Sequence, residues 1–421
     1  MESTGVAIAG RRPVDRSRTF WEAMSNLEPA YVERHPVSDS ERAFAGALEL
    51  VMSGQPDEAE LRLDSLRSNA SDSVVRAASR RLLTAMLQYQ DKWKILSELN
   101  PTRRTDAPVT EVRDRAEVEA WADAFKDVAE RKLTFPSRVV VLPLSLSASG
   151  APMIPILVNG QRRFFWLDTG SSMSIVASNV AAASGITPLI PDTLEIATAT
   201  GRVAAQPAAI ARLEIGGIRI ASSTAMIVDS DLMEVRLGSK ASEVVKIDGI
   251  IGYDVISRLD VSIDYVNRRV TVARPVRDER AARIPRNLFW VGTPIVRLIT
   301  TRGTALHFNL DTGAQETYST DALIAKMKVR TFVGERRLVG GLAGLQTVRG
   351  RFINEMRLSL AGQPLVFRKL LVFAPAYSTF VSLDGILGGD IGKTGVVRID
   401  ATNGRFLIER QSGNEGLRVG S

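Results

Sequence analysis

The sequence predicts a multidomain chain, in which an all-α N-terminal domain is followed by an all-β part made of two pseudo-symmetric closed lobes. Apolar residues recur at helical spacing up to about residue 132. From Val139 onward, short β-branched runs alternate with glycine, asparagine and proline, and two stretches of this part carry the same motifs in the same order. We expect a helical domain at 1–135, a first lobe at 136–275, a linker at 276–290 and a second lobe at 291–421.

The helical domain begins with a pair of amphipathic segments. Apolar residues from Ala43 to Val51 share one helix face, Gly54-Gln55-Pro56 interrupts the pattern, and Ala59, Leu63 and Leu66 follow in phase. This pair resembles a tetratricopeptide unit, whose small positions match Gly54 and Ala59. Such units bury their cores by stacking, usually in three or more copies. The chain has one reasonable copy and one degraded copy, so a plain helical bundle is an equal alternative. Either could bind a protein partner or brace the β part.

Composition excludes several function classes. The net charge is +7, but the arginines are scattered and no nucleic-acid-binding module is present, which indicates a solvated surface. The chain has no cysteine and only two histidines, so we expect no disulfide, no thiol catalysis and no metal site built on thiolates or histidines. The longest apolar run, Val139–Leu146, contains Pro143 and is far shorter than the ~20 residues of a membrane span. Met1–Arg12 lacks the apolar core of a signal peptide. We expect a soluble protein, cytoplasmic by default, or periplasmic or secreted if a signal peptide has been removed.

The β-rich part contains an internal repeat. The first half carries Asp168-Thr169-Gly170 and the second carries Asp311-Thr312-Gly313. Each triplet follows an apolar strand and precedes, further along the chain, an Asp-Gly-Ile-Ile/Leu-Gly block that ends at Gly252 or Gly388. A single Asp-Thr-Gly triplet carries little information, but two copies with matching blocks indicate a duplication. The two halves would then bring their Asp-Thr-Gly loops together.

Two neighbouring carboxyl groups suit the hydrolysis of an amide bond. Two like charges close together cannot both ionise readily, so Asp168 and Asp311 would share one proton. The ionised member can take a proton from water, and the protonated member can polarise the scissile carbonyl. Gly170 and Gly313 allow close approach of backbone, while the hydroxyls of Thr169 and Thr312 can link the two loops. Because both loops lie in one chain, we expect the active site to be complete in a monomer.

These motifs resemble those of the retropepsin/pepsin superfamily of aspartic peptidases over residues 138–410, most closely bacterial enzymes with both lobes in one chain. Asp168-Thr169-Gly170-Ser171-Ser172 is similar to the catalytic loop of pepsins, and Asp311-Thr312-Gly313-Ala314 to that of retroviral enzymes. Ile250-Ile251-Gly252 and Ile386-Leu387-Gly388 resemble the turns that pack against those loops. The resemblance implies an endopeptidase that holds an extended peptide between its lobes, with apolar residues flanking the scissile bond and no cofactor.

The resemblance also implies hairpins, or flaps, that close over the substrate. The first candidate, Thr198-Ala199-Thr200-Gly201, lacks the tyrosine of pepsin flaps, and the second, Gly340-Gly341-Leu342-Ala343-Gly344, resembles the glycine-rich retroviral flap. The expected substrate-binding residues are Thr200, Gly201, Gly340, Gly341 and Leu342.

The two catalytic loops differ at one position, which holds Ser171 in the first and Ala314 in the second. A Ser171 hydroxyl bonded to Asp168 would stabilise the ionised carboxylate. We therefore expect Asp168 to act mainly as the base and Asp311 mainly as the acid.

Three other interpretations compete with this one. Asp-x-Gly-Ser also occurs in actin- and hexokinase-like ATPases, and a degenerate peptidase could bind peptides without cleaving them. A catalytic arrangement of His307 with an aspartate and a serine is a weak third, because a histidine on the incoming strand is more often packed or exposed. We expect Asp264 and Asp400 to cap turns, and Asp254 and Asp390 to stabilise the starts of short helices.

Overall fold

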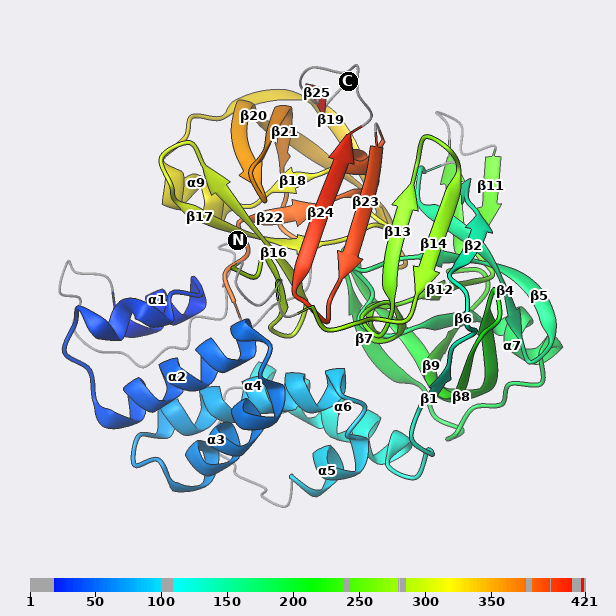
Figure 1. The fold of residues 1–421 in the computed structure, drawn as a ribbon, viewed down its shortest axis with the longest axis horizontal. Helices are drawn as coiled ribbons and strands as arrows, with labels where there is room; N and C mark the ends of the chain where they lie inside the picture. The colour runs from blue at the N-terminus through cyan, green and yellow to red at the C-terminus, as the bar shows by residue number, and fades with distance from the viewer. Residues whose placement is uncertain are drawn as a thin grey trace.

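The computed structural model describes residues 19–99, 109–147, 149–237, 243–278, 280, 285–375, 381–393, 395–410 and 418–419. The segment Met1–Arg12, discussed above for its lack of a signal-peptide core, lies outside the described residues. Helices make up the first part of the chain, and two barrel-like sheets form most of the rest (Figure 1). The predicted fold class is therefore confirmed: an all-α N-terminal part precedes a bilobal, β-rich part.

The helical part is a set of short helices whose ends are fixed by the sequence. Ser38 and Glu41 form a capping box at the start of α2, Gly54 ends α2 with a φ of 75°, and Pro56 opens α3. Helix α2 packs on α3, and α3 on α4. Whether this packing is a tetratricopeptide repeat stays a prediction. The elements are α1 (Phe20–Ser25), η1 (Pro29–Glu33), α2 (Asp39–Ser53), α3 (Pro56–Asn69), α4 (Ser73–Tyr89), α5 (Trp93–Glu98) and α6 (Val109–Phe125).

The first lobe is a nine-stranded sheet with the order β1-β9-β6-β12-β5-β4-β8-β7, in which β3 pairs with β4. It curls on itself because the long strand β8 pairs with β7, β4 and β9. Its elements are β1 (Lys132–Thr134), β3 (Ser145–Leu146), β4 (Pro152–Val158), β5 (Gln161–Leu167), β6 (Ile175–Ala177), α7 (Ser178–Ala183), β7 (Leu194–Thr198), β8 (Gly201–Ile215), β9 (Ile218–Val228), β12 (Gly249–Ile251) and α8 (Tyr253–Ile256). A separate ribbon joins β10 (Glu234–Leu237) to β11 (Glu243–Lys246).

The second lobe is also a nine-stranded sheet, with the order β15-β16-β17-β22-β18-β21-β20-β19, in which β25 pairs with β21. The long strand β20 pairs with β19, β21 and β16. Its elements are β15 (Leu288–Trp290), β16 (Pro294–Thr300), β17 (Ala305–Leu310), β18 (Tyr318–Ser319), α9 (Asp321–Met327), β19 (Phe332–Gly341), β20 (Gly344–Leu360), β21 (Gln363–Val372), β22 (Gly385–Leu387), η3 (Gly389–Gly392) and β25 (Arg418–Val419).

Both lobes use the same pairing beneath their catalytic loops. Strand β12 runs parallel to β5 and antiparallel to β6, and β22 runs parallel to β17 and antiparallel to β18. The glycine of each Asp-Gly-Ile block is required by packing, because a Cβ on Gly249 would lie 2.3 Å from the ring of Phe165. A Cβ on Gly385 would lie at the same distance from the ring of Phe308. The repeated sequence blocks thus occupy corresponding places in the two sheets.

A five-stranded sheet, with the order β2-β14-β13-β23-β24, joins the two lobes through antiparallel pairing of β13 with β23. Asp264 and Asp400 cap the adjoining turns by accepting bonds from the backbone of Asn267 and Asn403, as predicted. The strands are β2 (Val140–Pro143), β13 (Asp260–Asp264), β14 (Arg269–Ala273), β23 (Gly395–Asp400) and β24 (Arg405–Arg410). The positions of the domain boundaries stay predictions. Strands β1 and β15 lie just before the predicted starts of the two lobes, at 136 and 291, and pair within the sheets of the first and second lobe.

Three stacked aromatic rings connect the helical part to both lobes. Tyr89 ends α4, Tyr253 begins α8 in the first lobe, and Trp290 lies in β15 of the second. Their ring centroids are 4.9–6.0 Å apart and their planes differ by 7–21°. The indole of Trp290 also donates to the carbonyl of Ala85, at 3.2 Å. The helical part therefore packs against the β-rich part at the junction of its lobes.

Candidate active site

The two Asp-Thr-Gly loops leave their sheets in the same way. Asp168 follows β5, and its backbone N–H donates to the carbonyl of Ile251 at 3.1 Å. Asp311 follows β17, and its backbone N–H donates to the carbonyl of Leu387 at 3.0 Å. The apolar-apolar-glycine turns thus pack against the Asp-Thr-Gly loops, as the resemblance implied.

The two loops are joined by a reciprocal set of hydrogen bonds between threonines. The hydroxyl of Thr169 donates to the carbonyl of Leu310 (2.8 Å) and accepts from the backbone N–H of Thr312 (3.0 Å). The hydroxyl of Thr312 donates to the carbonyl of Leu167 (2.7 Å) and accepts from the backbone N–H of Thr169 (3.1 Å). Both threonines are buried, so these bonds fix the position of one lobe's loop against the other's.

The carboxyl group of each loop lies against the glycine of the other. A Cβ on Gly170 would lie 2.4 Å from Cγ of Asp311, and a Cβ on Gly313 would lie 2.5 Å from Cγ of Asp168. No side chain fits at either glycine without displacing a carboxyl. Residues separated by 141 positions (Gly170 and Asp311) and by 145 positions (Asp168 and Gly313) are thus brought together, and the absent side chains make the space for the aspartates.

Both carboxyls accept bonds from their own loops. The backbone N–H of Gly170 donates to Asp168 Oδ1, and that of Ala314 donates to Asp311 Oδ1, each at 2.8 Å. Burial raises the pKa of Asp168 above its ordinary value, and the backbone donors oppose that shift. Burial together with the neighbouring charge of Asp168 raises the pKa of Asp311 further. The two carboxyls titrate as a pair, so they can share one proton at a pH where two ordinary carboxyls would both be ionised.

The prediction that the Ser171 hydroxyl bonds to Asp168 is wrong. That hydroxyl donates instead to the carbonyl of Met173, at 2.6 Å, within the same loop. The difference between Ser171 and Ala314 therefore does not act on the pair through a side-chain bond to Asp168. Ser171 contributes through its backbone: its N–H lowers the pKa of Asp168, and its carbonyl accepts from the N–H of Tyr253.

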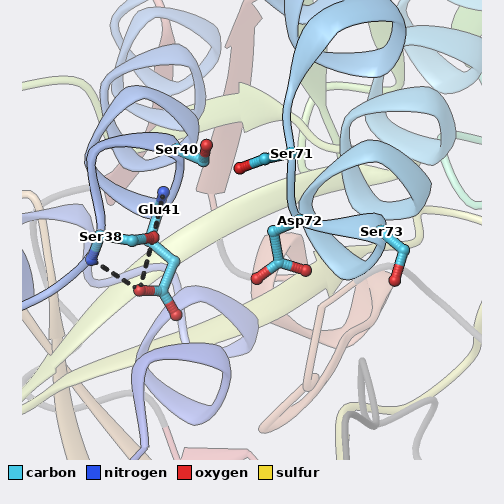
Figure 2. A pocket seen from close by; sticks show the side chains of 6 residues that line it. All are labelled: Ser38, Ser40, Glu41, Ser71, Asp72 and Ser73. Carbon is cyan, nitrogen blue, oxygen red and sulfur yellow. Dashed lines mark hydrogen bonds between the residues drawn. The ribbon is translucent and has the colours of Figure 1, made fainter.

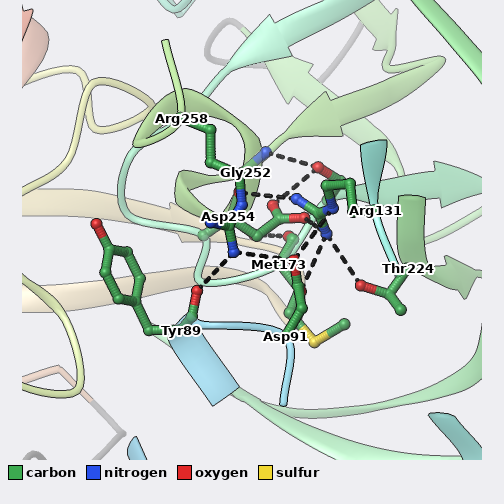
Figure 3. Close-up of polar contacts among 10 residues, drawn as sticks. Tyr89, Asp91, Arg131, Met173, Thr224, Gly252, Asp254 and Arg258 are labelled. Atoms are coloured by element: carbon green, nitrogen blue, oxygen red, sulfur yellow. Dashed lines mark hydrogen bonds and ion pairs between the residues drawn. The ribbon is translucent and has the colours of Figure 1, made fainter. Parts of the chain in front are cut away.

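A buried charged network supports the first catalytic loop from below (Figure 3). Ser174 accepts from the N–H of Gly252 and donates to Asp254, and Asp254 receives a bond from Arg131 at 2.8 Å. The side chain of Arg131 is only 3% exposed, and its guanidinium also pairs with Asp91, at the end of α4. No sequence motif indicated this network, because Arg131 and Asp91 lie outside every repeated block.

The second lobe repeats only the inner part of this network. Thr317 accepts from the N–H of Gly388 and donates to Asp390, in the positions that Ser174 and Asp254 occupy in the first lobe. Asp254 and Asp390 do lie in the first turns of α8 and η3, but neither helix has a side-chain cap. Their carboxylates instead fix the serine and threonine beneath the catalytic loops. Burial raises the pKa of both carboxyls, and Arg131 opposes that shift at Asp254.

The two flap candidates are hairpins whose tips meet. Thr198 pairs with Gly201 in the first, and Gly341 with Gly344 in the second. The side-chain amide of Gln346 donates to the carbonyl of Thr200 at 2.6 Å. A Cβ on Gly341 would lie 2.6 Å from the hydroxyl of Thr200, and one on Gly201 would lie 3.2 Å from Cβ of Ala343. Gly340 and Leu342 belong to the second hairpin, so the expected flap residues gather where the two tips touch. Gln346 was not anticipated.

His307 lies in the core of the second lobe, 2% exposed. Within the described part of the chain neither ring nitrogen has a hydrogen-bond partner, and burial lowers the pKa of the ring to about 3. This environment gives no support to a catalytic arrangement of His307 with an aspartate and a serine. The described residues also include no group of three or more His, Asp or Glu side chains placed to hold a metal ion.

A polar pocket lies on the helical part, where α2 and α4 begin (Figure 2). Two of its residues, Ser38 and Glu41, cap α2, and Asp72 caps α4 by accepting from the N–H of Val74 at 2.8 Å. The pocket shares no residue with the catalytic loops or hairpins. Its lining residues are Ser38, Ser40, Glu41, Ser71, Asp72 and Ser73.

Comparison with known proteins finds a family match within the first lobe. Residues 154–255 match the family model of aspartyl proteases, a stretch that contains Asp168, the first hairpin and the turn at Ile250-Ile251-Gly252. No curated protein sequence matches the chain. The crystal structure of an aspartic proteinase from Irpex lacteus is similar, with 11% identity and a TM-score of 0.41 over 65% of this chain and 98% of that one. None of the described helices is long and apolar enough to cross a membrane. The family match thus lies within the first lobe, over residues 154–255, and contains the first of the two Asp-Thr-Gly loops.

Proposed function

We propose that the protein is an aspartic endopeptidase whose catalytic pair is Asp168 and Asp311. The observation that carries the proposal is the fit of each carboxyl against the glycine of the opposite loop, 2.4–2.5 Å from where a Cβ would lie. Two carboxyls held this close share a proton, and the threonine bonds between the loops hold the pair in place. Both loops belong to one chain, so no second copy is needed to complete the site.

The proposed reaction uses the difference between the two aspartates. Asp168 takes a proton from a water molecule while the water oxygen attacks the scissile carbonyl carbon. Asp311 donates its proton to the carbonyl oxygen. The resulting diol collapses when the C–N bond breaks: the amine leaves with the proton held by Asp168, and a diol hydroxyl returns a proton to Asp311. The raised pKa of Asp311 supports its role as the acid, because the group stays protonated where an ordinary carboxyl would ionise.

The proposed substrate is an extended peptide segment between the lobes. A strand can bind to hairpin backbones through main-chain hydrogen bonds, and its alternate side chains can enter pockets on either side. The two hairpin tips touch at Thr200 and Gly341, so such a peptide would enter when the tips separate. The family resemblance favours apolar residues next to the scissile bond.

The test is cleavage of a mixture of unstructured peptides by the wild type, Asp168→Asn and Asp311→Asn. Each variant should lose hydrolysis by at least about 10³-fold, because one ionisable carboxyl remains and the acid–base pair is broken. Asp192→Asn is the matched control: it makes the same chemical change at an exposed aspartate of the first lobe and should cleave like the wild type. Thermal unfolding of all four proteins checks that folding is retained.

Other results would redirect the assignment. Substantial hydrolysis by either single variant would contradict the two-carboxyl mechanism. A wild type that binds peptides but cleaves none would indicate a peptide-binding module. The activity per molecule should also stay constant on dilution to nanomolar protein, because both aspartates are in the same chain; a loss of specific activity that tracks dissociation of a dimer would contradict the monomeric site.

A further inference from the structure

Helix α6 of the helical part holds the first hairpin close to its tip. The indole N–H of Trp121 donates to the carbonyl of Glu195 in β7, at 3.3 Å. Arg202, the second residue of β8, forms ion pairs with Glu117 of α6 and with Glu195, the latter at 3.1 Å. Arg202 is adjacent in sequence to Gly201, which closes the turn. One helix thus contacts both strands of the hairpin.

The residues of α6 that make these contacts are themselves anchored. Trp121 is 6% exposed, and its ring stacks on Phe125 at 5.6 Å between centroids. Phe125 is fully buried and packs against Trp93 of α5, at 4.9 Å. The first hairpin is therefore connected to the core of the helical part through a continuous run of aromatic side chains.

The second hairpin reaches the same point from the other lobe. The tip of the second hairpin lies on the first, through the bond from Gln346 to the carbonyl of Thr200 and the close approach of Gly341 to the Thr200 hydroxyl. Thr200 is one position from Gly201 and two from Arg202, so the contact with α6 and the contact with the second tip lie at one end of the hairpin.

We propose that α6 fixes the position of the first hairpin, so that the helical part determines how readily the tips separate to admit substrate. Glu117, Trp121 and Arg202 are then positioning residues, which act on substrate through the hairpin and touch no reacting atom. The proposal rests on the proposed peptidase function. With the first hairpin braced, opening occurs mainly by movement of the second, and loosening α6 makes the closed arrangement harder to form.

The test combines hydrogen exchange with kinetics in Trp121→Phe and Arg202→Gln. Trp121→Phe keeps an aromatic ring but removes the N–H donor, and Arg202→Gln removes the charge. In both variants the paired amides of residues 194–205 should exchange about two- to five-fold faster, the range expected for loss of a partly exposed ion pair or hydrogen bond. KM for a peptide should rise by a similar factor, while kcat stays within about twofold.

The matched control is Arg212→Gln, because Arg212 forms an ion pair with a glutamate of the same strand, Glu214, at 2.9 Å. This variant should leave the exchange of residues 194–205 and KM unchanged. Glu117→Gln should act in the same direction as Arg202→Gln. Adding Glu117→Gln to Arg202→Gln should change little, since both changes break the Glu117–Arg202 pair.

The outcomes separate this proposal from the proposed function. If the wild type cleaves no peptide, the exchange measurement still decides the role of α6. If both test variants show the same hydrogen exchange and the same KM as Arg212→Gln, the proposal that α6 holds the first hairpin is wrong. Faster exchange spread evenly over the helical part and both lobes would also overturn it, because it would indicate a general loss of stability.

Discussion

His307 makes the stability of the second lobe depend on pH. Its ring is buried beside Lys326 of α9 and Arg297 of β16, and burial followed by these two positive charges lowers its pKa to about 3, from an ordinary value of 6.5. The carboxylate of Asp384 accepts a bond from the backbone N–H of His307 and pairs with Lys326 at 3.1 Å. The folded protein thus holds the imidazole neutral, whereas the unfolded chain takes up a proton below pH 6.5.

The size of the effect follows from the two pKa values. A group whose folded pKa is depressed contributes stability that is present above its unfolded pKa and is lost as the pH falls. Between pH 8 and pH 5 the neutral His307 should therefore cost the folded state about 2 kcal/mol, and between pH 8 and pH 4 about 3 kcal/mol. A folded pKa one unit higher changes these figures little, since most of the loss occurs above pH 4.

Replacing His307 with leucine tests this reasoning. We expect His307→Leu to remove the pH-dependent cost while leaving all other titrating groups in place. Urea unfolding of both proteins at pH 8, 5 and 4 gives the free energy of unfolding for each. The variant minus wild-type difference should become more favourable to the variant by about 2 kcal/mol at pH 5 and about 3 kcal/mol at pH 4. A difference that does not change with pH would show that His307 titrates normally, and the buried position would be wrong.

Three further predictions concern the catalytic pair and the hairpins. Asp311→Asn should raise the free energy of unfolding at pH 7 but not at pH 3. The reason is that a group with a raised folded pKa gives stability that is lost as the pH rises through that pKa. Equal effects at both pH values in thermal unfolding would refute this. Thr312→Val should lower the free energy of unfolding by about 1–3 kcal/mol in urea unfolding, because it leaves the buried N–H of Thr169 and carbonyl of Leu167 unpaired, while Thr312→Ser should retain most of it. Gly341→Val should lower peptide turnover with little change in melting temperature, because its side chain would separate the tips at Thr200, whereas Thr347→Val, at an exposed position of the same hairpin, should have no effect on rate.

The arrangement of the catalytic loops could be predicted because the residues that set it are local and repeated. Asp, Thr and Gly each have one physical role at their position: a carboxyl, a hydroxyl that can reach the opposite loop, and an absent Cβ. The Asp-Gly-Ile blocks were informative for a similar reason, since Gly249 and Gly385 are required by the phenylalanines packed on them. Such residues can be recognised in a sequence because few residue types could replace them at these positions.

The contacts that could not be predicted join residues far apart in the chain. Arg131 and Asp254 are separated by 123 positions, and Arg202 and Glu117 by 85. Charged residues at these places look like ordinary surface positions in the sequence, and only the packing of the helical part on the first lobe brings them together. The error at Ser171 has a different origin. A serine hydroxyl can reach several acceptors. In this turn the hydroxyl of Ser171 donates to the carbonyl of Met173 and not to the carboxyl of Asp168.

The two lobes carry the same motifs, yet their surroundings make them unequal. Beneath the first catalytic loop, Asp254 is bonded by Arg131 and through it to the helical part; beneath the second, Asp390 is bonded by Thr317. The first hairpin is likewise held by α6 near its tip. The helical part therefore contacts the first lobe both beneath its catalytic loop and at its hairpin. Because Trp290 also connects the second lobe to α4, the contacts of α6 distinguish the first hairpin and not the whole first lobe. They connect the helical part to the half of the site that holds Asp168.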